Sequence, residues 1–138
     1  MSIRQKMHFE SGLLNVEATG EFSLDEAKRA FLEMLGAVTQ YQAKKVFLDG
    51  RTVRGKPGDL ERFCYGEFAA KETMRLVKEH GIAPQFAYVI KEPLRDPQRF
   101  GETVAVNRGM NIKVCETPQE AFERLERTPA SKLEAGDP

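Results

Sequence analysis

The residues best suited to bind a ligand lie in one glycine-rich segment, residues 49–58. It contains three glycines and three basic side chains, those of Arg51, Arg54 and Lys56. The segment follows a short apolar run, and open α/β sheets commonly bind ligands beyond the carboxyl ends of such strands. A helix that starts after it would add an N-terminus, which favours anions. We therefore predict a weak, salt-sensitive anion site; the alternative is a solvated turn whose glycines provide backbone freedom.

Charged residues beyond a second apolar run are the other candidates for chemistry. Glu92, Arg95 and Asp96 follow residues 86–90, so we expect them to lie near the 49–58 segment. An enzyme would need one such carboxylate to have a perturbed pKa beside a reactive group. A salt bridge between the two oppositely charged segments is the alternative, and we favour it.

The remaining reactive side chains do not combine into a site. His8 and His80 are far apart in the sequence, and His80 precedes Gly81 at an expected helix end, where a cation is stabilised. Cys64 and Cys115 lack metal-ligand or redox spacing. We expect them to be core thiols, since free cysteine packs like a small apolar residue. We predict no catalytic residues, no metal ligands and no cofactor.

The composition is typical of one folded domain that does not bind nucleic acid. Of 138 residues, 41% are apolar, and 21 basic side chains balance 21 acidic ones, whereas DNA-binding domains usually have a basic excess. No apolar run approaches the roughly 20 residues of a membrane-spanning helix, and no signal-peptide pattern is present. We expect a cytoplasmic protein with a domain over residues 1–127 and a flexible tail over 128–138.

Apolar periodicity predicts an α/β fold with the element order ββαβαβαβα. Residues 3–9 and 13–18 are expected to form a hairpin, because the second run alternates and a tight-turn signal separates the two. Residues 46–48 and 86–90 are apolar throughout, which is typical of adjacent central strands buried on both faces. A last short strand is expected at 112–114. We therefore expect one mixed, mostly parallel sheet of four to five strands with flanking helices.

Capping residues mark the expected helices. The longest is predicted over residues 59–80, where Gly81 suits the C-terminus. Helix starts are predicted at three further places, from two capping boxes and one Asp-Pro pair: Ser23 with Glu26, Asp96 with Pro97, and Thr117 with Glu120.

The helix expected over residues 59–80 carries aromatic side chains on more than one side. At about 100° per residue, Phe63 and Tyr65 cannot both face the sheet. Tyr65 and Phe68 lie outside or at the margin of the side expected to pack, so we predict that they belong to a twofold dimer interface. The alternative is a monomer in which a loop or the tail covers them. The side expected to pack on the sheet contains Leu60, Phe63, Ala70, Met74 and Val77.

The stretch YVIKEPLRDPQRFGETVAVNRG, residues 88–109, resembles the STAS family of sulfate transporter and anti-sigma factor antagonist domains. The similarity is closer to its SpoIIAA-like branch of small bacterial proteins, a group often placed with CRAL-TRIO lipid-binding domains. A looser pattern extends over about residues 5–127. The resemblance implies a SpoIIAA-like fold that serves as a scaffold for binding a protein or a ligand.

The family's phosphorylation switch does not carry over with the resemblance. Its serine lies in an Asp-Ser-Ser-Gly-like motif at the start of the helix after the third strand. Asp49 is followed here by Gly50-Arg51, and Asp59 by Leu60-Glu61, so neither position has the serine. We predict no phosphorylation switch at this site, including at Thr52, the hydroxyl residue of the 49–58 segment.

These observations favour a non-catalytic, STAS-like binding or regulatory module. Its expected partners are a small anionic or lipid-like ligand, a protein partner, or a second copy of the chain. A small enzyme that uses the charged segments after the third and fourth strands is one alternative. A structural oligomerisation unit is the other.

Overall fold

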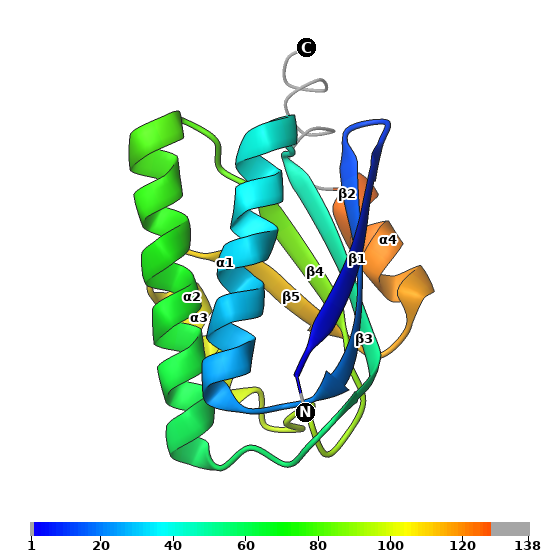
Figure 1. Cartoon of the computed structure of the whole chain (residues 1–138), viewed down its shortest axis with the longest axis vertical. Helices are drawn as coiled ribbons and strands as arrows, with labels where there is room; N and C mark the ends of the chain where they lie inside the picture. Colours follow the sequence, from blue (N-terminus) through cyan, green and yellow to red (C-terminus); the bar gives the residue numbers. More distant parts are fainter. Residues whose placement is uncertain (1, 128–138) are drawn as a thin grey trace.

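The elements follow one another in the predicted order, ββαβαβαβα, within residues 2–127, which the computed structural model describes (Figure 1). The tail expected over 128–138 lies outside the described residues. The strands are β1 (Arg4–Glu10), β2 (Leu13–Glu21), β3 (Lys45–Arg54), β4 (Gln85–Val89) and β5 (Asn111–Cys115). The helices are α1 (Leu24–Tyr41), α2 (Asp59–His80), α3 (Phe100–Asn107) and α4 (Pro118–Arg127).

The strands form one five-stranded sheet in the order β1-β2-β3-β4-β5. Only the β1–β2 hairpin is antiparallel among these neighbours, and the other three pairs are parallel. The two continuous apolar runs pair with each other, Val46 with Phe86 and Leu48 with Tyr88. The predicted mixed sheet, with these two runs adjacent in its interior, is therefore confirmed.

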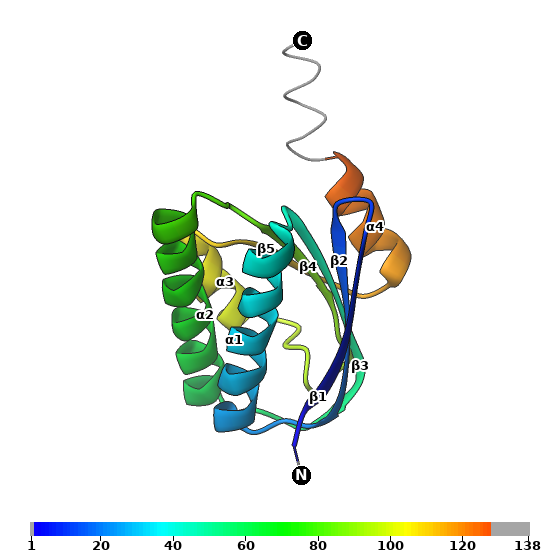
Figure 2. The same cartoon turned by 45° about the horizontal axis from the view of Figure 1, so that its top comes forward.

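Helices cover both faces of the sheet, as Figure 2 shows: α1, α2 and α3 lie on one side and α4 on the other. The larger core, on the first side, contains Phe31, Leu48 and Phe86. The smaller core, under α4, contains Phe47 and Leu125. None of the helices within residues 2–127 is long and apolar enough to cross a membrane.

Strand β3 is longer than predicted and includes most of the segment expected to be a loop. It continues to Arg54, because β2 also continues to Glu21 and the two strands pair again after an irregularity at Glu17/Thr19. A Cβ atom at Gly50 would lie 3.0 Å from the Ile90 side chain. Gly50 therefore permits close packing inside a strand, and its reading as a turn residue is wrong.

The predicted capping residues also hold distant parts of the chain together. The Glu26 N–H donates to Ser23 Oγ at 3.2 Å, as a capping box requires. The Glu26 carboxylate, however, accepts from the Ile3 N–H at 3.1 Å, where a capping box would use the Ser23 N–H. This bond ties the start of the chain to α1. At α4, the Glu120 N–H donates to Thr117 Oγ1 at 3.2 Å.

Helix α3 begins at Phe100, three residues later than predicted from Asp96-Pro97. Arg99 has a φ of 59°, in the left-handed region, and so cannot belong to the helix. Asp96 still acts as an acceptor at this end, because its carboxylate receives the N–H groups of Gln98 and Phe100, each at 3.0 Å. The Asp96-Pro97 pair thus predicted a helix start close to the observed one, but three residues too early.

The side of α2 that packs inward differs from the predicted one. Leu60, assigned to that side, is 74% exposed. The helix approaches α3 closely through a glycine, because a Cβ at Gly66 would lie only 2.5 Å from the Gly101 carbonyl oxygen. The prediction considered large apolar residues, whereas small ones form most of this contact. The buried residues of α2 are Gly66, Ala69, Ala70, Thr73 and Leu76.

Candidate ligand cavity

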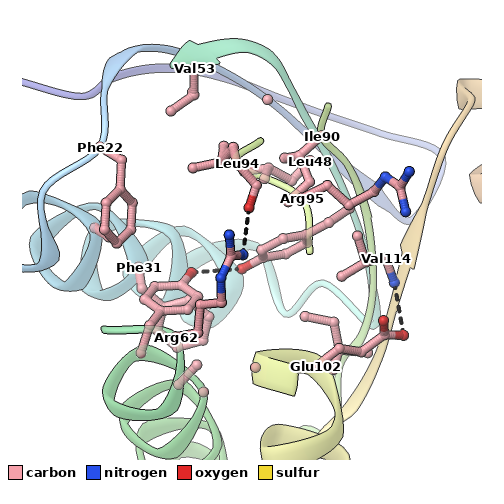
Figure 3. Close-up of a pocket in the computed structure, with 18 of the residues that line it drawn as sticks. Phe22, Phe31, Leu48, Val53, Arg62, Ile90, Leu94, Arg95, Glu102 and Val114 are labelled. Carbon is pink, nitrogen blue, oxygen red and sulfur yellow. Dashed lines mark hydrogen bonds between the residues drawn. The ribbon is translucent and has the colours of Figure 1, made fainter. Parts of the chain in front are cut away.

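A cavity of about 170 Å³ lies between α1, α2 and the sheet. It adjoins the carboxyl-terminal parts of β3 and β4, where α/β sheets commonly bind ligands. Residues 90–99, which connect β4 to α3, border it on another side (Figure 3). Its wall is mainly apolar and includes Phe22, Phe31, Leu48, Val53, Ile90 and Leu94.

Two tyrosine hydroxyl groups meet in the wall of this cavity. The Tyr65 hydroxyl of α2 and the Tyr88 hydroxyl of β4 are 3.2 Å apart. Burial raises the pKa of Tyr65 to about 12 and that of Tyr88 well above 10, so both keep their protons near neutral pH. Their shared bond uses one of the two O–H groups. Within residues 2–127 neither hydroxyl makes another hydrogen bond, which leaves one O–H group to donate to a ligand.

The tyrosine pair is expected to make stability fall at high pH. A raised pKa means that the folded chain keeps a proton where the unfolded chain has lost it. The stabilisation that the buried, protonated tyrosine pair contributes to folding is therefore complete below pH 10 and is lost as the pH rises towards 12. Urea unfolding at several pH values across this range should show a shallower decline for Tyr65→Phe/Tyr88→Phe than for the parent. Parallel declines would contradict the prediction. Tyr41→Phe, which loses an exposed hydroxyl group, is the matched control.

Arg62 of α2 joins the cavity wall to the 90–99 segment. Its guanidinium donates to the carbonyl oxygens of Leu94 at 2.8 Å and Pro93 at 3.0 Å. Figure 3 shows the guanidinium reaching Leu94, whose side chain borders the cavity. Arg62 and Tyr65 are three residues apart on one helix, so their side chains are neighbours. Arg62 thus holds the connecting segment against the cavity.

The two other arginines in the cavity wall, Arg95 and Arg99, are paired with glutamates. Arg99 binds Glu102 at 3.0 Å, and the two side chains bind the C=O and N–H groups of Val114 on the edge strand β5. Arg95 binds Glu92 at 2.8 Å and Glu116 at 3.5 Å. The glutamates therefore neutralise the charges of Arg95 and Arg99 locally.

The prediction of a salt bridge between the 49–58 segment and the charged residues that follow β4 is wrong. Arg51 binds Asp49 of its own strand, with two contacts of 2.9 and 2.7 Å, and Glu92 binds Arg95. The extension of β3 explains the difference, because it leaves Asp49 and Arg51 as side chains of one strand. Hydrogen bonding from Arg51 also lowers the pKa of Asp49.

The three basic residues of the predicted anion site lie outside the cavity. Arg51, Arg54 and Lys56 are exposed, and none belongs to the cavity wall. Arg51 and Arg54 are in strand β3, and Lys56 follows in the connection to α2. Arg51 is already paired with Asp49. Anion binding by these residues stays a prediction.

The outward placement predicted for Tyr65 and Phe68 is wrong. Both rings pack edge-on against Phe31 of α1, with centroid distances of 6.1 and 6.4 Å. They face the large core, because the small residues beside them allow α2 to lie close to α1 and α3. Their assignment to a dimer interface loses its basis, while dimerisation itself stays a prediction.

Of the two predicted core thiols, the structure places Cys115 in the core and Cys64 only partly so. Cys115 is buried, and burial raises its pKa, whereas Cys64 is half-buried. His8 is exposed and lies 3.0 Å from Glu10. His80 is the last residue of α2. Within residues 2–127 no cluster of three potential metal-binding side chains occurs.

The fold is similar to that of solved anti-sigma factor antagonists. No protein-family model matches the sequence, and no curated protein matches it either. An anti-sigma factor antagonist from Mycobacterium paratuberculosis superimposes with a TM-score of 0.57, covering 91% of this chain and 95% of its own, at 16% identity. The antagonist SpoIIAA in its unphosphorylated form gives 0.50, covering 91% and 100%, at 12% identity. Together with the sheet order, these similarities confirm that the chain adopts a SpoIIAA-like fold.

Proposed function

We propose that the protein is a non-catalytic regulatory module that binds a small, mainly apolar ligand in the cavity. The cavity itself carries the proposal. It has about 170 Å³ of space and a mainly apolar wall, and an apolar cavity of about 150 Å³ is large enough for benzene. The ligand body is therefore expected to be about the size of one aromatic ring.

The regulatory part of the proposal is supported by the fold. Two solved proteins of similar structure are anti-sigma factor antagonists. The segment 90–99 borders the cavity and is also part of the surface, since Lys91 and Glu92 are exposed. A ligand that alters this segment would alter the surface presented to a partner.

Contact with another protein chain is the second candidate function. Leu60 is 74% exposed and Phe100 is 40% exposed, and Phe63 stacks on Phe100 with centroids 6.5 Å apart. These three residues give α2 and α3 an apolar surface near the cavity. Such a surface supports binding to a protein partner or a second copy of the chain.

The contacts of the carboxylates weaken the enzyme alternative. The pKa of Asp49 is lowered, chiefly by the hydrogen bond from Arg51. The pKa of Asp96 is lowered, chiefly by the Phe100 N–H. A general base works best with a pKa near the operating pH, and both shifts move these carboxyl groups away from it.

Filling the cavity should abolish ligand binding. Ala30 is buried in α1 and lines the cavity, so Ala30→Leu would occupy ligand space. Nuclear magnetic resonance titration with benzyl alcohol should shift signals from cavity residues in the parent. We expect binding to Ala30→Leu to be at least about tenfold weaker, because overlap with a side chain excludes the ring.

The matched control is Ala83→Leu, which adds the same atoms at an exposed position outside the cavity wall. It should bind benzyl alcohol like the parent. Equal binding by folded Ala30→Leu and parent, or shifts confined to residues outside the cavity, would refute the proposed function.

A further inference from the structure

Arg62 is a cation in the cavity wall that lacks a carboxylate partner within residues 2–127. Its two hydrogen bonds go to neutral carbonyl groups, those of Pro93 and Leu94. No carboxylate oxygen of the described chain lies within 4.0 Å of it. Asp96 is near enough for Arg62 to contribute to its lowered pKa, but its oxygens accept backbone N–H groups.

The other ionic groups in the wall do not cancel this charge. Arg95 and Arg99 are bound to glutamates. The lining includes three arginines, Arg62, Arg95 and Arg99. Of these, Arg62 is the arginine without a carboxylate oxygen within 4.0 Å in the described part of the chain, so its guanidinium is the cation left to meet an anionic group.

The tyrosine pair, with its one unused O–H donor, lines the same cavity wall as Arg62. Tyr65 follows Arg62 by three residues on α2, and its hydroxyl group binds that of Tyr88. The guanidinium has five N–H donors, two of which are used. Both polar features of the wall can therefore donate hydrogen bonds, one of them with a positive charge. Their complement is an anionic group with acceptor oxygens on an apolar body.

We propose that the ligand is a small monocarboxylate, with its apolar body in the cavity and its carboxylate bound by Arg62 and the spare tyrosine O–H group. This inference rests on the proposed function of the cavity. Burying a carboxylate without a cation is costly, whereas hydrogen bonds between ions are about twice as strong as neutral ones. A neutral ligand of the same shape would lack the ionic attraction to Arg62, and a cationic one would be repelled by it.

Three ligands with the same ring test this charge preference: benzoate, benzyl alcohol and benzylamine. Their dissociation constants are measured by nuclear magnetic resonance titration at constant ionic strength. The parent should bind benzoate at least about tenfold more tightly than benzyl alcohol, and benzylamine most weakly. Arg62→Gln should lose the preference for benzoate while still binding benzyl alcohol. Arg62→Lys, which keeps the charge but loses the planar donor fork, should keep part of the preference.

Two variants act as controls. Arg75→Gln removes a mostly exposed arginine from the same helix and should keep the preference of the parent. Arg51→Ala/Arg54→Ala removes two basic residues of the predicted anion site, which lies outside the cavity, and should do the same. A loss of benzoate preference in the latter variant would assign the anion site to strand β3 and overturn the inference.

The outcomes separate this inference from the proposed function. Binding of benzyl alcohol as tightly as benzoate by the parent would overturn the carboxylate inference and leave the cavity function intact. Binding of none of the three ligands would defeat both. Arg62→Gln could also lose benzyl alcohol binding if the 90–99 segment is released. Arg62→Lys is then the deciding variant. A preference of Arg62→Lys for benzoate over benzyl alcohol supports the inference, and equal binding of the two ligands overturns it.

Discussion

Replacing Phe31 by alanine is expected to lower the free energy of unfolding by about 3–5 kcal/mol. Phe31 is 1% exposed and lies at the centre of the aromatic cluster that joins α1 to α2 and β4. Its ring centroid is 5.9 Å from that of Phe86, and Tyr65 and Phe68 pack edge-on against it. Alanine removes the apolar contacts and leaves a cavity that the surrounding elements fill only in part.

Urea unfolding followed by circular dichroism measures this effect, and Leu32→Ala is the matched control. Leu32 is the next residue of α1 and is 46% exposed, so its truncation should cost less than about 1 kcal/mol. Similar losses for the two variants would show that Phe31 is not the centre of the core.

Replacing Gly66 by alanine is expected to lower the free energy of unfolding by about 1–3 kcal/mol. The new Cβ would lie 2.5 Å from the Gly101 carbonyl oxygen, a backbone atom that can move only if α3 moves. Alanine normally favours a helix over glycine by about 1 kcal/mol, so the close contact must exceed this gain. The result would confirm that small residues set the distance between α2 and α3.

The same substitution at Gly36 should have the opposite sign. Gly36 is exposed in α1, and a Cβ there would meet no atom within 4 Å. Gly36→Ala should therefore stabilise the protein by up to about 1 kcal/mol through helix propensity alone. Equal effects of the two substitutions, measured by urea unfolding, would contradict the close α2–α3 contact.

The parts of the fold predicted correctly are those with a local signal. The apolar runs at 46–48 and 86–90 predicted interior strands because burial on both faces requires apolar residues at successive positions. Ser23 and Thr117 predicted helix starts because their side chains bind N–H groups only three residues away. The resemblance of residues 88–109 to the STAS family added the overall arrangement, which the similar solved structures confirm.

The parts predicted wrongly depend on contacts between distant segments. Glycine at position 50 indicates a turn in isolation, but pairing of β2 with β3 makes it part of a strand. Tyr65 lies beyond the apolar side of α2 on a helical wheel, yet Tyr88 of β4 supplies its hydrogen-bond partner.

The cavity was missed for the same reason. Its wall combines α1, α2, the sheet and the 90–99 segment, and no local pattern reports their spacing. Two residues of the sequence could nevertheless have indicated polar positions in a buried wall. Tyr88 places a polar tip within an apolar run, and Arg62 places a charge on a largely apolar helix side. Either residue would have been a reason to expect a polar position in a buried wall.

A crystal structure of the protein with benzoate would show directly whether a monocarboxylate occupies the cavity. We expect one benzoate ring between α1, α2 and the sheet, in contact with Phe31 and Leu48. Its carboxylate should lie within hydrogen-bond distance of Arg62 and of one tyrosine hydroxyl group of the Tyr65–Tyr88 pair. A cavity that stays empty at saturating benzoate, or a benzoate bound only outside it, would contradict ligand binding in this cavity.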